Sequence, residues 1–357
     1  MNKIKKIAEF YGQLDNPLLA PRGVFMHDNT LVVSDTGQNR VFIWHDFNFQ
    51  TFQKPNVILG QKDDHQMDRN AGKEVSGSSL QYPSGIWTNG EKIIVADAWN
   101  HRVLVWNQMP TKNFQEADIV IGQKDFNSNL PNIEGIGKSP DNNTLNWPYG
   151  VYSNGSELWI ADTGNRRVLY FEKIPSKNFA NASEVIGQNN FFEKDYDNNN
   201  AVWPYSIKVG HNNDMLISDT QFCRVLYWEQ WKNAINNPPN LVMGQKDIND
   251  SGQNQYQLKP SAHTLNWVYD ACFFNNGIVI ADTGNSRLIL HDKIPSTNNA
   301  SGSLQIGQPN FETHGETSLS MKSNINNEMY WPFAVNASVD FLITADTGNH
   351  RILFYKI

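Results

Sequence analysis

Six copies of one motif run through the chain, and this repetition limits the folds open to it more than any other feature. Each copy places an arginine five residues after an aspartate, and in the first five copies a Gly-Gln pair begins 25 residues after the aspartate. A separation this constant tolerates no insertion, so we expect each of these segments to be a rigid, packed unit. The six aspartates are Asp35, Asp97, Asp162, Asp219, Asp282 and Asp346.

Variation in length is confined to one segment of each repeat, between the Gly-Gln pair and the next Pro or its equivalent. These segments, called inserts below, hold 7 to 24 residues. The rest of each repeat consists of short β-branched and aromatic runs, separated by Asn-Gly, Asp-Thr-Gly-Asn and Pro turns. This pattern predicts a four-stranded antiparallel meander in every repeat, with strands a to d in chain order.

Units of this size cannot bury both faces alone, and stacking them in a ring solves that problem. We therefore predict an all-β fold, a six-bladed β-propeller that forms a single domain over residues 1–357. The chain ends sharpen the prediction: only 11 residues follow Asp346, so the last repeat lacks its own strand d. Residues 7–13 look like a strand d with no preceding blade. We expect this N-terminal strand to pair with the last blade and close the ring.

The combination of Asp-Thr-Gly-Asn-x-Arg with an upstream Pro-x-Gly-Val resembles the NHL-repeat family of six-bladed propellers. The resemblance covers nearly all of the chain. Gly-Gln-x-x-Phe runs, such as the one that begins at Gly122, look like a bacterial branch of that family. The resemblance implies the fold and leaves the function open, because the family includes RNA-binding and protein-binding modules, sensor domains and a peptide-amidating lyase.

Charge and composition narrow the classes of partner. The formal net charge is -7 and the pI is about 5.7, so the field around the protein repels phosphate backbones and we expect no nucleic-acid partner. The sequence has neither an apolar run long enough to span a membrane nor the apolar segment of a signal peptide. We expect a cytoplasmic monomer without a membrane partner. Two cysteines exclude a disulfide framework or a cysteine-rich zinc site.

Positions where the repeats disagree are the best candidates for a functional site, because the repeated Asp, Arg and Gly-Gln residues serve every blade. Antiparallel strand order puts the inserts and the turns between strands b and c on one face. Two of these turns carry an aromatic residue in place of the consensus, Trp99 and Phe222. Each side chain is expected either to pack under an insert or to contact a ligand.

A second candidate set consists of the aromatic residues that precede the repeated proline, or Val268 in the one repeat of the five where valine replaces it. Five of the six repeats have such an aromatic residue, with Ala20 in the sixth, and the rings are expected to pack between blades or, where exposed, to bind sugar or peptide side chains. The five residues are Tyr82, Trp147, Trp203, Trp267 and Trp331.

The third set surrounds the central channel. The residues expected at its rim are Arg22, Ser84, Tyr149, Tyr205, Tyr269 and Phe333. Arg22 is the one cation among them. The resemblance implies a glycine near the start of the inner strand, and Asp270 and Ser206 replace it in two repeats. Arg22 and Asp270 either orient a zwitterionic or peptide ligand or form a structural pair. Bulky side chains on the inner strands are expected to plug the channel; they are Phe25, Trp87, Tyr152, Lys208, Cys272 and Asn336.

Two classes of function remain open. The resemblance to the amidating lyase implies an arginine, tyrosines and a histidine-bound metal near the channel mouth. Arg22 with Tyr205 or Tyr269 matches the first two, but none of the channel positions is a histidine. A metal would require His65, His263 and His314 to converge from separate inserts, and we expect no metal or other cofactor. The sequence favours a module that binds a peptide, protein or small polar ligand; the alternative is a lyase or hydrolase without redox chemistry.

Overall fold

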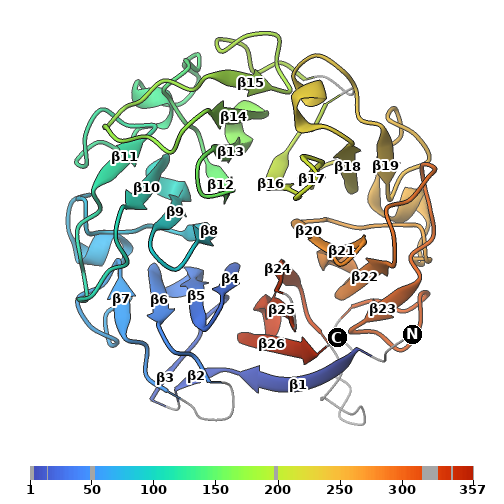
Figure 1. Cartoon of the computed structure of the whole chain (residues 1–357), viewed down its shortest axis with the longest axis horizontal. Helices are drawn as coiled ribbons and strands as arrows, with labels where there is room; N and C mark the ends of the chain where they lie inside the picture. The colour runs from blue at the N-terminus through green and yellow to red at the C-terminus, as the bar shows by residue number, and fades with distance from the viewer. Residues whose placement is uncertain are drawn as a thin grey trace.

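The computed structural model describes residues 4–13, 15–48, 53–196, 200–315, 329–338 and 341–356. In this part of the chain, six four-stranded antiparallel sheets stand around a central axis, as Figure 1 shows. The predicted six-bladed propeller is confirmed.

Each blade begins at the axis with strand a, and the strands follow outward. Blade 1 comprises β4 (Gly23–His27), β5 (Thr30–Asp35), β6 (Arg40–Trp44) and β7 (Val57–Leu59). Blade 2 comprises β8 (Pro83–Thr88), β9 (Ile93–Asp97), β10 (Arg102–Trp106) and β11 (Ile119–Ile121). Blade 3 comprises β12 (Pro148–Ser153), β13 (Leu158–Asp162), β14 (Arg167–Phe171) and β15 (Glu184–Ile186).

The second half of the ring repeats the same order. Blade 4 comprises β16 (Pro204–Val209), β17 (Met215–Asp219), β18 (Arg224–Trp228) and β19 (Leu241–Met243). Blade 5 comprises β20 (Asp270–Phe274), β21 (Gly277–Asp282), β22 (Arg287–His291) and β23 (Leu304–Ile306). Blade 6 comprises β24 (Pro332–Ala337), β25 (Phe341–Asp346), β26 (Arg351–Lys356) and, from the other end of the chain, β1 (Lys5–Phe10). Between blades 6 and 1, β2 (Gly12–Gln13) pairs with β3 (Asn16–Pro17).

Short 3-10 helices lie in the turns and inserts. In five blades one covers the turn between strands b and c: η1 (Thr36–Gln38), η3 (Ala98–Asn100), η5 (Thr163–Asn165), η8 (Thr283–Asn285) and η11 (Thr347–Asn349). The other 3-10 helices of the described residues are η2 (Arg69–Gly72), η4 (Pro131–Ile133), η6 (Trp231–Ile235) and η7 (Gln253–Tyr256). No helix in the described residues is long and apolar enough to cross a membrane.

The N-terminal strand closes the ring, as predicted. β1 pairs antiparallel with β26 and lies on the outer side of blade 6 (Figure 1). Phe10 at its end packs edge-on against Trp44 of blade 1, with ring centroids 5.3 Å apart. Glu9 accepts a hydrogen bond of 3.0 Å from Arg351. The two chain ends therefore hold the first and last blades together.

The repeated Asp and Arg form a buried ion pair in every blade. Arginine Nε donates to aspartate Oδ2 at 2.7 to 2.9 Å in all six pairs. In blade 3, Arg167 also donates to the carbonyls of Phe191, Asp141 and Thr144 in the flanking inserts. The pair therefore fixes both the turn and the inserts, which is the structural role expected of a residue present in every copy.

A threonine hydroxyl joins most neighbouring blades. Thr36 Oγ1 donates to the carbonyl of Pro83 in the next blade at 2.6 Å, and Thr163 does the same to Pro204. Thr347 donates to Pro21 and so links the last blade to the first. Blade 2 has Ala98 at this position and lacks the hydroxyl.

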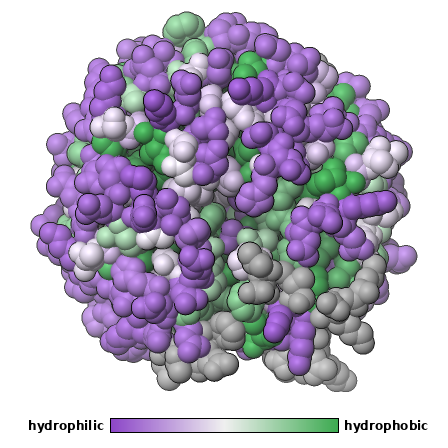
Figure 2. Space-filling model, in the orientation of Figure 1, coloured by the Kyte–Doolittle hydropathy of each residue, from purple (hydrophilic) through white to green (hydrophobic). Residues whose placement is uncertain are grey.

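Apolar side chains fill the spaces within and between blades, and Trp44, Trp106, Trp159 and Trp228 are among the largest fully buried ones. On the face seen in Figure 2, hydrophilic side chains cover most of the surface, and hydrophobic ones form smaller patches. The inner strands approach closely at the axis. A Cβ at Gly150 would lie 2.5 Å from the carbonyl oxygen of Tyr205 in the next blade, so only glycine fits there.

Candidate functional site

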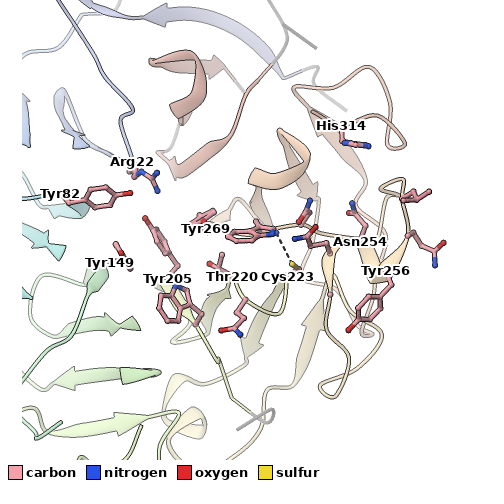
Figure 3. A pocket seen from close by; sticks show the side chains of 18 residues that line it. Arg22, Tyr82, Tyr149, Tyr205, Thr220, Cys223, Asn254, Tyr256, Tyr269 and His314 are labelled. Carbon is pink, nitrogen blue, oxygen red and sulfur yellow. Dashed lines mark hydrogen bonds between the residues drawn. The ribbon is translucent and has the colours of Figure 1, made fainter. Parts of the chain in front are cut away.

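A pocket of about 1210 Å³ opens at one end of the axis and extends toward blades 4 and 5. Its residues come from three places: the starts of the inner strands, the turn of blade 4, and the inserts that follow blades 4 and 5. In Figure 3, Arg22 and four tyrosines gather near the axis, whereas Asn254, Tyr256 and His314 lie farther out. The four tyrosines are Tyr82, Tyr149, Tyr205 and Tyr269. The lining residues are Arg22, Tyr82, Tyr149, Trp203, Tyr205, Thr220, Gln221, Cys223, Gly252, Gln253, Asn254, Tyr256, Gln257, Leu258, Asn266, Trp267, Tyr269 and His314.

Aromatic rings from successive inner strands contact one another around the axis. Tyr149 stacks on Tyr205 with ring centroids 4.7 Å apart, and Tyr205 meets Tyr269 edge-on at 4.6 Å. Tyr269 in turn contacts Phe333 at 4.1 Å. Four of the residues expected at the rim are thus brought together, and they form one continuous aromatic wall.

Arg22 completes this wall. Its guanidinium carbon lies 3.9 Å from the centroid of the Phe333 ring and 5.1 Å from that of Tyr82. Tyr82 reaches Tyr149 edge-on at 6.2 Å, which closes the circle. Cation-π contacts of this kind stabilise a guanidinium without neutralising it. The cation therefore stands between two aromatic faces at the mouth of the channel.

Blade 2 departs from the repeat at Ser84 in the rim and at Trp99 in the turn, and the two departures are structurally related. Ser84 at the rim has no ring, although its hydroxyl lies 3.3 Å from that of Tyr205, and Tyr82 takes the place in the wall that aromatic rim residues fill in other blades. Trp99 from the turn stacks on Tyr82, with centroids 4.5 Å apart and planes 9° from parallel. Its indole Nε1 donates to the Tyr149 hydroxyl at 3.4 Å. Trp99 therefore supports the wall from behind and is absent from the pocket lining.

The pKa values of three tyrosines of the wall and of Arg22 are shifted away from neutral pH. Burial raises the pKa of Tyr149 to about 12, and burial also raises the pKa of Tyr82 and of Tyr269. Burial acts to lower the pKa of Arg22, but the neighbouring Tyr205 and Tyr82 outweigh it and the pKa lies above its usual value. At neutral pH the pocket thus presents a permanent cation and protonated hydroxyls, which are hydrogen-bond donors.

The aromatic residues before the prolines are held by the preceding blade. The residue before the repeated Arg accepts a hydrogen bond from their backbone amide: Asn39 from Tyr82 at 3.0 Å and Cys223 from Trp267 at 3.3 Å. This places their backbone in the left-handed region, with φ of +56° at Tyr82 and +48° at Trp267. The hydrogen bond from the backbone amide thus fixes the position from which each aromatic side chain projects.

The boundary between blades 3 and 4 departs from this scheme. The residue before the repeated Arg is Arg166, whose side chain has no acceptor. The amide of Trp203 donates instead to Asp219 at 2.9 Å, and Trp203 is absent from the left-handed residues. Trp203 and Trp267 line the pocket, whereas Trp147 and Trp331 are exposed outside it. Four equivalent tryptophans thus fall into two groups.

Two other candidates lie outside the pocket lining. Phe222 is buried and covers Arg224, whose guanidinium carbon lies 4.8 Å from its ring centroid. Asp270 accepts a hydrogen bond from Lys208 Nζ at 2.9 Å and others from the amides of Ala271 and Val335. The carboxylate of Asp270 is therefore engaged by Lys208 and not by Arg22.

The channel beneath the wall is nearly filled, with a cavity of about 30 Å³. Phe25, Lys208 and Asn336 line it, as expected of a plug. Trp87, Tyr152 and Cys272 were expected there too, but they pack in the apolar clusters between blades. All six positions have the same strand parity, and the partners of the side chains make the difference: Lys208 binds Asp270 and Asn336 accepts from the Met26 amide at the channel, whereas Trp87, Tyr152 and Cys272 pack against apolar side chains. The pocket thus has a closed floor.

The sequence predicts that long inserts wall the basin, but it does not single out the residues of the outer wall, which the insert after blade 4 supplies. Gln245 of the Gly-Gln pair donates to the carbonyl of Gly252 at 2.8 Å, and Asn254 pairs with Asn285 of the blade 5 turn at 2.8 and 3.0 Å. These bonds hold η7 over blade 5. The signal in the sequence was a Gly followed by a polar Gln-Asn-Gln-Tyr run, but only the paired asparagines show where it docks.

The insert histidines lie apart from one another. His314 lines the pocket, His65 lies 3.5 Å from Asp64, and Nδ1 of His263 lies 2.9 Å from Ser301 Oγ. Within the described ranges, no three His, Cys, Asp or Glu side chains are grouped to hold a metal ion. Burial raises the pKa of the Cys223 thiol to about 12, so this pocket cysteine is a neutral thiol at physiological pH.

Comparison with known proteins identifies no family for the chain. No protein-family model matches the chain, and no curated protein matches its sequence. Among solved structures, the selenomethionine-substituted virginiamycin B lyase from Staphylococcus aureus is 9% identical, with a TM-score of 0.47 over 99% of each chain. The computationally designed Ika8 protein is also 9% identical, with a TM-score of 0.45 over 98% of this chain and 100% of that chain. A natural lyase and a designed protein are thus equally similar to this chain, and neither informs the site.

Proposed function

We propose that this protein is an NHL-type propeller that acts as a binding module for a peptide, a protein segment or a small polar ligand. The repeat signature supports the NHL relation, because its Asp, Thr, Asn and Arg each form a contact that recurs from blade to blade. The binding site is the pocket of about 1210 Å³ between the tyrosine wall and the insert after blade 4.

The composition of this pocket is the observation that carries the proposal. Aromatic faces alternate with hydroxyl and amide groups along its lining. Ligand sites are concave, largely apolar, and carry a few convergent polar groups, and this pocket is somewhat larger than the usual ~300 to 1,000 Å³. Such a lining suits an extended ligand that has both apolar and hydrogen-bonding groups.

Binding is favoured over the alternative of a lyase or hydrolase by the protonation states of the lining residues. A general base must lose its proton near the working pH, and a nucleophilic thiol must ionise. Tyr149 and Cys223 each have a pKa of about 12, and burial raises the pKa of Tyr269 as well. These groups are suited to donating hydrogen bonds.

Two equivalent tryptophans provide the test. Trp267 lines the pocket and Trp331 does not, yet each is 48% exposed, precedes strand a of its blade and has a positive φ. A random-sequence hexapeptide pool, an amino-acid panel and an oligosaccharide panel are first screened by thermal shift. For any probe that binds, Trp267→Ala is expected to weaken the affinity at least tenfold.

Trp331→Ala is the matched control and is expected to change the affinity less than twofold, because it removes the same indole from the same repeat position. Equal losses in the two variants would place the binding surface elsewhere on the insert face. Failure of every probe to bind at millimolar concentration would contradict the binding function.

A further inference from the structure

The environment of Arg22 differs from that of the six repeated arginines. Each of the six repeated arginines has an aspartate within 2.9 Å, but no carboxylate of the described residues lies within 4.0 Å of Arg22. Its neighbours are the Phe333 and Tyr82 rings and the Tyr205 hydroxyl, to which it is hydrogen-bonded. These neutral groups leave the positive charge uncompensated, and a charge partly removed from water is costly without an ionic partner, so the site is arranged to receive an anion.

The charge and the hydrogen-bond donors of the other lining residues also favour an anionic ligand group. None of the described lining residues is acidic, although the protein as a whole has a net charge of -7. The hydroxyls of Tyr82, Tyr149 and Tyr269 keep their protons at neutral pH, because burial raises each pKa. A guanidinium with hydroxyl donors beside it can hold both oxygens of a carboxylate.

One permanent positive charge favours a singly charged ligand group. A phosphate monoester carries about two negative charges at neutral pH, and a single arginine in a negatively charged protein compensates only one of them. A carboxylate matches the charge of Arg22, and its planar geometry matches the guanidinium.

The shape of the pocket indicates where the rest of the ligand lies. Arg22 stands at the axis, and the pocket runs outward to the insert after blade 4 (Figure 3). Along this path Gln221, Gln253 and Gln257 expose amide groups that can pair with a peptide backbone. At the outer end Tyr256 and Leu258 are 78% and 95% exposed, and they offer apolar contact.

We propose that the ligand is a peptide with a free C-terminal carboxylate, which binds Arg22, and that its preceding residues extend outward between blades 4 and 5. This inference rests on the proposed binding function and adds the chemical group that anchors the ligand and the direction of the chain.

Two hexapeptide pools test it, identical in sequence and differing only in a free or an amidated C-terminus. Binding to the wild-type protein is measured by fluorescence polarisation at constant ionic strength. The free-acid pool is expected to bind at least tenfold more tightly than the amidated pool. This comparison needs no variant, so it stands even if substitutions at Arg22 disturb the fold.

Arg22→Gln is expected to weaken binding of the free acids about tenfold or more and to abolish the difference between the pools. Arg69→Gln is the charge-matched control, because Arg69 is an exposed insert arginine outside the pocket. It is expected to leave both affinities within twofold. Circular dichroism melts establish that both variants are folded.

The outcomes separate this inference from the proposed function. Equal binding of both pools, with Trp267→Ala still weakening it, would overturn the carboxylate anchor and leave the binding pocket in place. Stronger competition by inorganic phosphate than by acetate would assign the anion site to phosphate and overturn the inference. Binding of neither pool would contradict the inference and the peptide form of the proposed function together.

Discussion

Nδ1 of His101 accepts a hydrogen bond of 3.0 Å from the backbone amide of Trp147, across the boundary between blades 2 and 3. His350 accepts the same bond from Ala20 where the ring closes. Because a protonated imidazole has no acceptor, this contact requires neutral histidine. A residue that varies between repeats thus joins one blade to the next and places the start of the following inner strand.

This contact predicts a pH dependence. Burial lowers the pKa of His101 from 6.5 to about 4, so the unfolded chain binds a proton at a higher pH than the folded protein does. The stabilisation is complete above pH 6.5 and is lost as the pH falls from 6.5 to about 4, by up to about 3 kcal/mol. His101→Asn keeps an acceptor, as Asn39 does in blade 1, and its Tm is expected to fall less over this range. Superimposable pH profiles for the two proteins would contradict the role of His101.

The threonine contacts between blades predict a stabilising substitution. Ala98 stands where Thr36 and Thr163 donate to the next blade, and the carbonyl of Pro148 is the equivalent acceptor. Ala98→Thr is expected to raise the free energy of unfolding by about 1 kcal/mol, and Thr163→Ala to lower it by about 1 to 2 kcal/mol. Urea denaturation measures both. Destabilisation by Ala98→Thr would mean that this boundary is packed differently from the others.

Removal of the N-terminal strand tests ring closure. Deleting residues 1–13 removes β1, exposes the edge of β26 and takes Phe10 away from Trp44. We expect a loss of several kcal/mol, from the buried apolar area and the strand pairing, and self-association through the exposed edge. Denaturation and size-exclusion chromatography measure the two effects. A shortened chain that melts like the full one and stays monomeric would contradict closure by β1.

The ring and its closure could be predicted from the sequence because they depend on contacts that every repeat makes. Constant spacing from each Asp to its Gly-Gln pair requires the same blade six times, and the spare strand at one end matches the gap at the other. The face of the site followed from strand order. Arg22 and the rim tyrosines Tyr149, Tyr205 and Tyr269 could be singled out because the residue type at their shared repeat position changes from blade to blade. The structure brings these side chains together.

The contacts of individual side chains could not be predicted from the sequence in this way. Asp270 binds Lys208 of the neighbouring inner strand, and a choice between Lys208 and Arg22 depends on which way each side chain leaves its strand. The insert after blade 4 docks through the pairing of Asn254 with Asn285. Asn70 pairs with Asn100 and Asn132 with Asn165 in the same way, each ten residues after a repeated glycine, but the spacing alone does not show that these asparagines bind each other. Trp99 and Phe222 looked alike as departures from the consensus, yet one supports Tyr82 and the other covers Arg224.

Hydrogen exchange on ligand binding tests the central claim most directly. With the tightest binder of the free-acid pool present, amides in residues 220–223, 252–258 and 266–269 are expected to exchange at least several-fold more slowly. The turn between strands a and b of blade 3, residues 154–157, lies on the opposite face, serves as the internal control and is expected to be unchanged. Protection confined to another face, or no protection at saturating ligand, would contradict the assignment of this pocket as the binding site.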